Sequence, residues 1–208
     1  MSEKIYLNGE LVSIHQAAVS VSNPSFLHGV GLFETLRAYA GKPFRLSEHV
    51  ERLKRSAMHF NMPIGDAADR IPAAVQQVLD ANSLSSARVR VTVTPPGSTD
   101  EPHQVTLLVR AEETHGYPPE LYDRGMTVYV VNRFRQSRLD PLVGHKTTSY
   151  FPRLLALRDA QDHQCGEGLW FTPDNLLAEG CMSNVFVVRD GKLKTPPVDT
   201  PVLPGVTR

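Results

Sequence analysis

The chain has 208 residues, and its 22 lysines and arginines balance its 22 aspartates and glutamates, so the formal net charge is zero. This balance argues against a strongly charged partner such as a nucleic acid or an anionic membrane surface. The longest apolar stretches are the size of strands, far below the ~20 residues that cross a bilayer, and the first residues contain no signal-peptide core. We therefore expect a cytoplasmic enzyme or binding domain with ample apolar material for its core.

Cysteine usage points the same way. Cys165 and Cys181 are the only cysteines in the chain. Two cysteines are too few for a disulfide framework or a zinc site, so we expect two reduced thiols and no metal.

The first part of the chain is expected to form strands and turns. The segment 5–12 is typical of a hairpin, because two short apolar runs flank an Asn-Gly dipeptide. Phe26 to Tyr39 is expected to be a buried strand, opened by Gly29 and Gly31 and ended by a turn at 40–43.

Two amphipathic helices are expected next. Ser47 is a suitable N-cap for the first helix. Its apolar face is formed by residues at helical spacing, Val50, Leu53, Ala57 and Phe60. The second helix is predicted from Pro72 to Leu84, with the proline tolerated in its first turn. Alternating residues then predict strands at 87–93 and 104–110, joined by a loop over 94–102.

The segment 112–122 is rich in proline, glycine and acidic residues and is the best candidate for a linker. We therefore expect an N-terminal lobe at 1–114, a linker at 115–122 and a C-terminal lobe at 123–208. In the second lobe the pattern predicts a strand at 126–132, a helix at 150–163, and strands at 169–172, 184–189 and 192–195. Because strands and helices mix without regular βαβ alternation, the predicted fold class is α+β (mixed α/β) rather than a doubly wound sheet.

Three features far apart in the sequence suit the chemistry of pyridoxal phosphate. Lys146 could form an imine with this cofactor, Glu179 could keep its pyridine nitrogen protonated, and the Gly205-Val206-Thr207 turn could hold its phosphate through backbone amides. Each feature alone has a plainer interpretation: a solvent-facing lysine, a surface carboxylate and a turn that ends a strand. Their combination in this order favours a cofactor site.

Two further side chains leave alternatives open. Arg52 lies on the first predicted helix, where it could bind a phosphate through its fork or simply face solvent. Tyr150 follows Lys146 by four residues and could donate a hydrogen bond to the cofactor's phenolic oxygen or pack against its neighbours.

Five ordered motifs resemble the class IV aminotransferase family, also called fold-type IV pyridoxal-phosphate enzymes. This family includes branched-chain aminotransferases, D-amino-acid aminotransferases and aminodeoxychorismate lyases. The resemblance covers essentially the whole chain, and the segments that carry it are GVGLFETLR at 29–37, EHVERL at 48–53, GHKTTSY at 144–150, EGCMSNVF at 179–186 and LPGVTR at 203–208. It implies a two-lobed fold in which a small N-terminal α/β lobe and a larger C-terminal lobe enclose the cofactor.

The resemblance also implies roles for the residues that match these motifs. Lys146 would be the Schiff-base lysine and would move the proton between the substrate Cα and the cofactor, while Glu179 would pair with the pyridine nitrogen. Tyr150 and Thr35 complete the implied catalytic set. The phosphate would be held by Arg52, Val206 and Thr207, Arg138 would approach the phenolic oxygen, and Ser183 and Asn184 belong to the cofactor-binding set. Two chains would pair as a homodimer in which loops of one chain complete the site of the other.

The chain departs from the family pattern in two places. Typical members continue through a helix and further strands that add another phosphate contact, so the chain to Arg208 is either a fragment or a protein that has lost part of its second lobe. In both cases we expect it to bind the cofactor more weakly than a complete member. Many relatives also carry an arginine for the substrate carboxylate in a Thr-Arg-Gly run. The corresponding stretch here, 93–97, reads VTPPG, and the sequence does not identify a replacement.

The favoured function is transfer of an amino group between an amino acid and a 2-oxo acid. The alternative is aminodeoxychorismate lyase, which uses the same lysine to release pyruvate and form 4-aminobenzoate for folate synthesis. Thr35, the spacing from Lys146 to Tyr150 and the run 182–184 resemble the lyase and D-amino-acid groups. The Thr35 hydroxyl suits proton delivery in the lyase, but it could equally cap a strand. A third interpretation is a non-catalytic or incomplete member, which the retention of both Lys146 and Glu179 disfavours.

Overall fold

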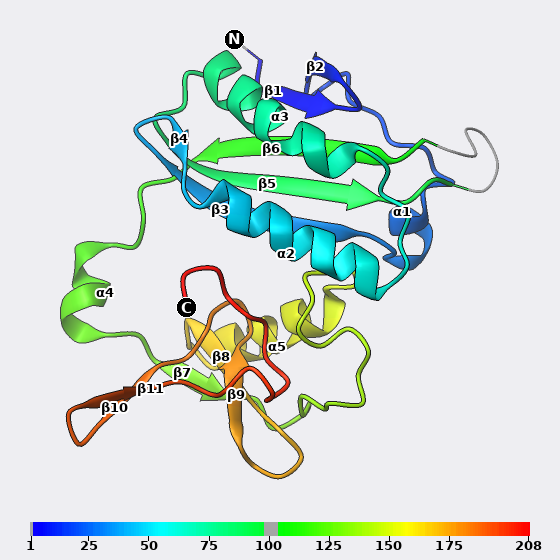
Figure 1. Cartoon of the computed structure of the whole chain (residues 1–208). Helices are drawn as coiled ribbons and strands as arrows, with labels where there is room; N and C mark the ends of the chain where they lie inside the picture. The colour runs from blue at the N-terminus through cyan, green and yellow to red at the C-terminus, as the bar shows by residue number, and fades with distance from the viewer. Residues whose placement is uncertain (1, 98–103) are drawn as a thin grey trace. The chain divides into compact units, whose positions relative to one another are not determined.

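The computed structural model describes residues 2–97 and 104–208 (Figure 1). The chain divides into two compact units. The first contains Met1–Gly116 together with Lys146–Ser149, and the second contains Tyr117–His145 and Tyr150–Arg208. The short segment around Lys146 therefore joins the first unit although it lies within the range 123–208. Residues 98–102 of the predicted loop lie outside the described residues.

The first unit is built on a six-stranded sheet with the order β2-β1-β6-β5-β3-β4. Its strands are β1 (Lys4–Leu7), β2 (Glu10–Ser13), β3 (Leu32–Tyr39), β4 (Lys42–Pro43), β5 (Ser86–Thr94) and β6 (Thr106–Glu113). All five pairings are antiparallel. The hairpin predicted at 5–12 is confirmed, with Asn8 at φ 52° and Gly9 at φ 114° in the turn. The two strands predicted near 87–93 and 104–110 pair along their whole length, although the second begins two residues later and runs to Glu113.

Two helices, α2 (Leu46–His59) and α3 (Ala67–Ala81), cover one face of this sheet (Figure 1). The strands turn alternate residues toward them, so that Val89, Val91 and Val93 of β5 are almost fully buried. On the helices Leu53 and Ile71 are equally buried in the same core. Full burial of each such side chain stabilises the fold by about 1.5–3 kcal/mol.

The opposite face of the sheet carries Phe33 and Thr35 from β3 together with Arg88 and Arg90 from β5. Thr35 pairs directly with Arg90 in the antiparallel register. Since paired residues of antiparallel strands project to the same side, these residues share the face that α2 and α3 leave uncovered.

The strand predicted for Phe26–Tyr39 is wrong in its first part. Residues Pro24–His28 form the short helix α1, and only Leu32–Tyr39 is strand. The helix is specified locally: Asn23 accepts a hydrogen bond from the Ser25 amide at its start, a proline occupies its first turn, and Gly29 ends it at φ 69°.

The two long helices are confirmed, but their starts differ from the prediction. Helix α2 begins at Leu46 after Arg45 in a left-handed conformation, so Ser47 lies inside the helix and its hydroxyl donates to Glu48. Helix α3 begins at Ala67, which places Pro72 in its interior rather than in its first turn. A proline usually marks the first turn of a helix, so the prediction starts α3 too late. Buried residues before Pro72, such as Ala68, extend the same apolar face.

The second unit contains a three-stranded sheet, a hairpin and two helices. The sheet has the order β7-β8-β9, with β7 (Val128–Val130), β8 (Glu167–Phe171) and β9 (Leu177–Gly180), and the hairpin pairs β10 (Val187–Arg189) with β11 (Lys192–Lys194). The helices are α4 (Pro119–Arg124) and α5 (Phe151–Asp162). Strand β9 was not predicted from the sequence. Its core neighbours include Val131, Ala156 and Trp170, and α4 lies within the stretch predicted as a linker.

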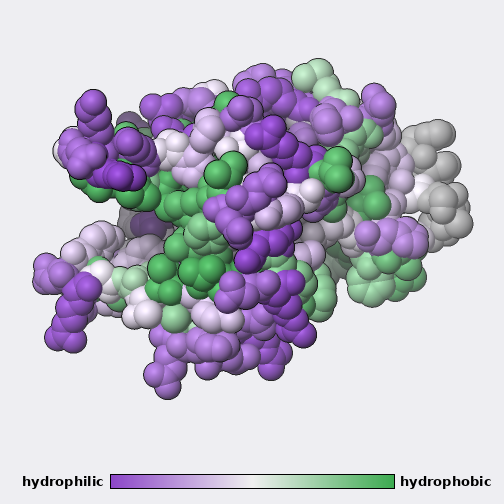
Figure 2. All heavy atoms as spheres, turned by 90° about the horizontal axis from the view of Figure 1, so that it is seen from below, coloured by the Kyte–Doolittle hydropathy of each residue, from purple (hydrophilic) through white to green (hydrophobic). Residues whose placement is uncertain are grey.

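Apolar groups also reach the surface. Figure 2 shows hydrophobic residues beside hydrophilic ones on the face it presents. Phe26 and Leu27 on α1 and Val188 and Leu193 on the β10–β11 hairpin are all more than half exposed. Within residues 2–97 and 104–208, no helix is both long enough and apolar enough to cross a bilayer.

Candidate functional site

Lys146 is held beside strand β3 by main-chain hydrogen bonds. The Phe33 amide donates to the Lys146 carbonyl at 2.9 Å, and the Thr148 amide donates to the Gly31 carbonyl at 2.9 Å. Leu32 and Thr147 form an isolated antiparallel bridge between these two contacts. The lysine side chain is half-buried and its Nζ lies 4.6 Å from the centre of the Phe33 ring. Its backbone is therefore fixed to a rigid strand, and its ammonium group lies over an aromatic face.

Two glycines permit this close approach. A Cβ added at Gly29 would lie 2.7 Å from Ser149 Oγ, and one added at Gly31 would lie 3.1 Å from a methyl group of Thr94. The Gly29 carbonyl in turn accepts hydrogen bonds from the hydroxyls of Thr148 at 2.6 Å and Ser149 at 3.0 Å. The Gly-Val-Gly run before β3 thus serves to seat the segment that carries Lys146.

Arg52 is buried in a charged cluster rather than facing solvent. Its Nε donates to Glu34 Oε1 at 2.8 Å and its Nη2 donates to Glu34 Oε2 at 2.6 Å. His49 Nδ1 lies 2.7 Å from Glu34 Oε2, and all three residues are at least 93% buried. Glu34 reaches them from β3, while His49 and Arg52 stand one turn apart on α2. The bidentate pairing fixes the plane of the guanidinium.

Burial alone would raise the pKa of Glu34, but the hydrogen bonds and charges of Arg52 and His49 outweigh it and lower that pKa. A carboxyl with a lowered native pKa stabilises the fold above its unfolded pKa of about 4.3 and loses this contribution as pH falls through the native value. The stability of the chain should therefore decline below about pH 4.3 in part through Glu34.

Glu34→Gln tests this link between charge and stability. We expect the substitution to lower the free energy of unfolding at pH 7 by about 3 kcal/mol, because it leaves the Arg52 cation buried without its counter-charge. The loss should shrink as pH falls, since the wild-type carboxyl then becomes neutral too. Urea denaturation from pH 7 to pH 3 measures both effects, with Glu51→Gln on the exposed side of α2 as the control. An equal loss at every pH would contradict an electrostatic role for Glu34.

Glu179 lies on β9 and is 2% exposed. Its Oε1 accepts a hydrogen bond from Gln136 Nε2 at 2.7 Å and contacts Arg153, while its Oε2 accepts from the Leu203 amide at 2.9 Å. Burial alone would lower the pKa of Arg153, but the Glu179 charge and hydrogen bond raise it. The contacts to Gln136, Arg153 and the Leu203 amide therefore fix the orientation of the buried Glu179 carboxyl group.

The Leu203 contact connects Glu179 to the predicted phosphate turn within the same unit. Asn184 Nδ2 donates to the Leu203 carbonyl at 3.0 Å, so both the amide and the carbonyl of Leu203 are hydrogen-bonded to side chains. A Cβ added at Gly205 would lie 1.8 Å from Asn184 Oδ1, which leaves room for glycine alone. The loop that leads into Val206 and Thr207 is thereby braced from two directions.

The other predicted site residues are spread over both units. Ser183 donates to Glu167 Oε2 at 2.9 Å, and the Tyr150 hydroxyl donates to Met182 Sδ at 3.3 Å. Arg138 is exposed, and Thr35 is partly exposed on β3. Val206 is half-buried and Thr207 is exposed. The structure thus brings Glu179 and Asn184 together around Leu203, and seats Lys146 beside β3 next to Phe33.

Four residues that matter to these clusters were not identified as site residues from the sequence. Glu34 and His49 belong to the motifs at 29–37 and 48–53, but the sequence does not show that their side chains contact each other. Gln136 and Arg153 approach Glu179 from a loop and from α5, at sequence distances of 43 and 26. Only the three-dimensional arrangement reveals that they share one carboxylate.

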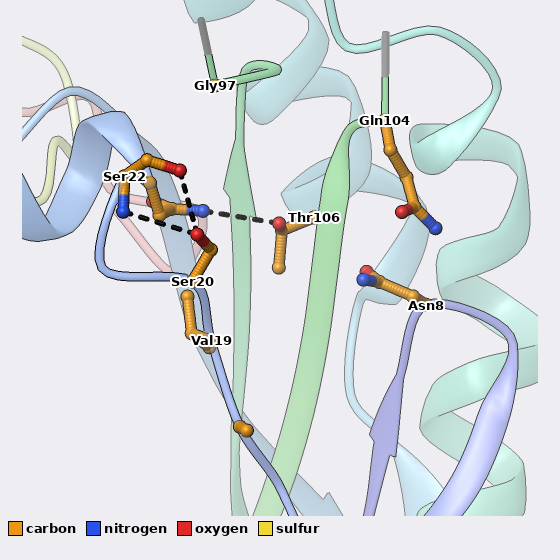
Figure 3. A pocket seen from close by; sticks show the side chains of 9 residues that line it. Asn8, Val19, Ser20, Ser22, Gly97, Gln104 and Thr106 are labelled. Atoms are coloured by element: carbon orange, nitrogen blue, oxygen red, sulfur yellow. Dashed lines mark hydrogen bonds between the residues drawn. The ribbon is translucent and has the colours of Figure 1, made fainter. Parts of the chain in front are cut away.

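A separate cavity of about 330 Å³ opens at one end of the first unit's sheet (Figure 3). Its lining is small or polar: Asn8, Ala18, Val19, Ser20, Ser22, Asn23, Gly97, Gln104 and Thr106. Asn23 Nδ2 donates to Thr106 Oγ1 at 3.2 Å across its wall (Figure 3). Among these described lining residues there is no cationic side chain.

Comparison with known proteins identifies the family. The family model described as "Amino-transferase class IV" matches residues 31–208. A putative branched-chain-amino-acid aminotransferase of Methanocaldococcus jannaschii is 33% identical, over 99% of this chain and 72% of its own length. The aminodeoxychorismate lyase of Bacillus subtilis is 29% identical, over 98% of this chain and 71% of its own length.

The fold agrees with this result. The branched-chain aminotransferase of Thermoproteus uzoniensis, solved with norvaline, has a TM-score of 0.87 and 29% sequence identity, covering 99% of this chain and 72% of that one. Another branched-chain amino acid aminotransferase, solved with pyridoxamine 5'-phosphate, has a TM-score of 0.88 and 27% identity over 100% of this chain and 71% of its own. The predicted fold-type IV architecture is thereby confirmed. The chain belongs to the class IV aminotransferase family.

Proposed function

We propose that this chain is a pyridoxal-phosphate-dependent aminotransferase that moves an amino group between an amino acid and a 2-oxo acid. The observation that carries the proposal is the buried Glu179 carboxylate, oriented by Gln136, Arg153 and the Leu203 amide. A buried carboxyl group held in a fixed orientation is suited to bind a ligand group that must stay protonated. A relative's structure with pyridoxamine 5'-phosphate supports the choice of cofactor.

The donor set fits this cofactor. Oε1 of Glu179 already has two partners, whereas the described contact to Oε2 is a single backbone amide. A carboxylate oxygen can accept two hydrogen bonds, so Oε2 can still accept one from a protonated pyridine nitrogen.

Each residue then has a defined task. Bound pyridoxal phosphate supplies the electron-withdrawing ring that acidifies the substrate Cα proton. Lys146 would provide the amine that holds the cofactor, and its Nζ would be the group that accepts the proton from the substrate Cα. Glu179 keeps the pyridine nitrogen protonated.

The remaining predicted residues hold the cofactor in place. We propose that the amides of Val206 and Thr207 hold the phosphate, and the predicted phosphate contact of Arg52 stays a proposal because its Nε and Nη2 donate to Glu34. Asn184 acts through the loop that it braces at Leu203. Arg138, Tyr150 and Ser183 stay assigned to the cofactor-binding set, the first two near the phenolic oxygen.

A second candidate activity is aminodeoxychorismate lyase. Thr35 places a hydroxyl on the same sheet face as Phe33, whose ring contacts Lys146, so it is suited to deliver a proton near that lysine. The B. subtilis relative of that name supports this alternative. The two activities share the step in which Lys146 removes a proton and differ in the later steps.

Steady-state kinetics separate the two candidates. A transaminase should give parallel double-reciprocal plots when the amino acid and the 2-oxo acid are varied, because the first product leaves before the second substrate binds. Intersecting plots would count against this order. Release of pyruvate and 4-aminobenzoate from aminodeoxychorismate, without conversion of any amino acid, would establish the lyase instead.

We further propose that two chains pair and that the protein works in the cytoplasm. Exposed apolar side chains such as Phe26 and Leu27 supply surface that a partner subunit could cover. Cys165 and Cys181 are both buried free thiols, which suits a reducing compartment. Light scattering of the purified protein measures the first proposal directly, and a mass of one chain at micromolar concentration would contradict it.

A further inference from the structure

The carboxyl group of Glu167 accepts hydrogen bonds from the loop that follows strand β9. Its Oε1 accepts from the Gly168 amide at 2.9 Å and from the Cys181 amide at 3.1 Å. Its Oε2 accepts from the Met182 amide at 3.2 Å and from the Ser183 hydroxyl at 2.9 Å. A carboxylate offers about four acceptor sites, so the donors found among the described residues match the full capacity of this side chain.

The register of strands β8 and β9 brings Glu167 to this loop. Leu169 of β8 pairs with Gly180 of β9 in an antiparallel ladder. Counting on by two residues in each strand places Glu167 opposite Met182, just beyond the end of β9. At this point the Glu167 side chain, in place of the main chain of β8, accepts the Met182 amide.

Glycine at position 180 makes room for the carboxyl group. A Cβ added to Gly180 would lie 3.1 Å from the carboxyl carbon of Glu167 and closer still to Ser183 Oγ. The Gly180 amide donates to the Ser183 carbonyl at 2.8 Å, which closes a tight turn over 180–183. Successive backbone amides that converge on one acceptor group form a nest, and here the nest is filled by a side chain of the same unit.

The turn 180–183 separates two residues that both contact Leu203. Glu179 stands immediately before the turn and accepts from the Leu203 amide at 2.9 Å. Asn184 stands immediately after the turn and donates to the Leu203 carbonyl at 3.0 Å. Both side chains reach one residue only while the turn keeps their backbones at this separation. The proposed cofactor contact of Glu179 and the path of the loop toward Val206 therefore depend on the shape of the turn.

We propose that Glu167 is a positioning residue for the cofactor: its carboxyl group is the template on which the turn 180–183 folds, and it thereby places Glu179 and Asn184. This inference rests on the proposed aminotransferase function. It also gives Ser183 a defined task, because a hydroxyl that donates to Glu167 acts on the cofactor through the turn.

Glu167→Ala tests the template. We expect it to weaken pyridoxal phosphate binding about 10-fold, because the Met182 amide and the Ser183 hydroxyl lose their acceptor. Sodium formate should restore part of the affinity by placing a small carboxylate in the emptied nest, whereas sodium chloride at equal ionic strength should not. Glu167→Gln should show the loss without the rescue, because its amide fills the space. Asp174→Ala removes an exposed carboxylate between β8 and β9 and should match the wild type.

Trp170 reports the state of the turn without any reaction. It is the only tryptophan of the chain, and its Nε1 donates to Cys181 Sγ at 2.9 Å. Its emission should change in Glu167→Ala and return toward the wild-type spectrum in formate, and its quenching by added pyridoxal phosphate measures the affinity. Unchanged affinity in Glu167→Ala, or a loss that formate does not reduce, would overturn the proposal.

Ser183→Ala keeps the test decisive if Glu167→Ala does not fold, because it removes a single hydroxyl. It should weaken cofactor binding about 3-fold in the wild type and add little to the loss in Glu167→Gln. Additive losses would mean that Ser183 acts independently of Glu167, and the proposal would be wrong.

Failure of this proposal is distinguishable from failure of the proposed function. Wild-type protein that binds pyridoxal phosphate but converts no amino acid would contradict the proposed function and leave the result for Glu167 standing. Wild-type protein that converts amino acids, while Glu167→Ala binds the cofactor normally, would overturn the role of Glu167 alone.

Discussion

Lys146→Ala should abolish amino-group transfer, with a fall in rate of about 10⁴-fold or more. The lysine is the only group assigned both to attach the cofactor and to move the Cα proton, so no neighbouring side chain replaces it. Its backbone is fixed by the Phe33 and Thr148 hydrogen bonds, and alanine keeps both of these contacts. The variant should therefore fold normally and lose the chemistry alone.

Three measurements check this prediction together: the rate of transfer, the visible absorbance of the protein with pyridoxal phosphate, and the urea midpoint. Lys146→Ala should lose the absorbance band of covalently attached cofactor and retain the wild-type midpoint. Lys42→Ala, an exposed lysine of the same unit, is the matched control and should retain all three properties. A band that persists in Lys146→Ala would assign the attachment to another lysine.

Glu179→Gln is expected to have the second largest effect. The amide cannot stabilise a protonated pyridine nitrogen as a carboxylate does, so the transfer rate should fall by about 100- to 1000-fold. The substitution also leaves Arg153 buried without its counter-charge, which should cost about 3 kcal/mol of unfolding free energy. Rate and stability are thus both expected to fall, and the two effects need to be separated.

Arg153→Gln provides that separation. This variant breaks the same ion pair but keeps the Glu179 carboxylate, with Gln136 and the Leu203 amide still bound to it. We expect a comparable loss of stability and a much smaller loss of rate. If both variants lost the transfer rate equally, the effect of Glu179→Gln would come from disruption of the fold and not from loss of the charge at the pyridine nitrogen.

Elements with a strong local pattern could be predicted from the sequence. The hairpin around Asn8 follows from turn chemistry, and α2 and α3 follow from residues spaced at the helical period. The starts of α2 and α3 were misplaced for local reasons. Helical periodicity does not reveal that Arg45 adopts the αL conformation before α2, or that Pro72 lies inside α3.

Strand β9 shows why other elements could not be predicted. It has only four residues, LAEG, which is too short for a clear pattern. Three consecutive residues are buried, so apolar and polar residues do not alternate along it. It forms a strand because it pairs with β8 and because the carboxylate of Glu179 contacts Arg153 and Gln136. Such contacts join distant parts of the chain and leave no signal in the local sequence.

The candidate site divides in the same way. Lys146 and Glu179 could be proposed from their neighbours and their order in the chain. That Arg52 would be buried against Glu34 could not, because a helix residue and a strand residue 18 positions apart meet only after folding. The contacts of Glu167 with Met182 and Ser183 likewise depend on the register of β8 and β9.

The most direct test of the account is an absorbance titration of the purified chain with pyridoxal phosphate, followed by addition of alanine, glutamate or leucine. We predict a visible band that one of these amino acids converts to the spectrum of pyridoxamine phosphate, with release of the matching 2-oxo acid in an amount equal to the bound cofactor. A chain that gives no band, or a band that no amino acid changes while aminodeoxychorismate yields pyruvate, would contradict the assignment as an aminotransferase.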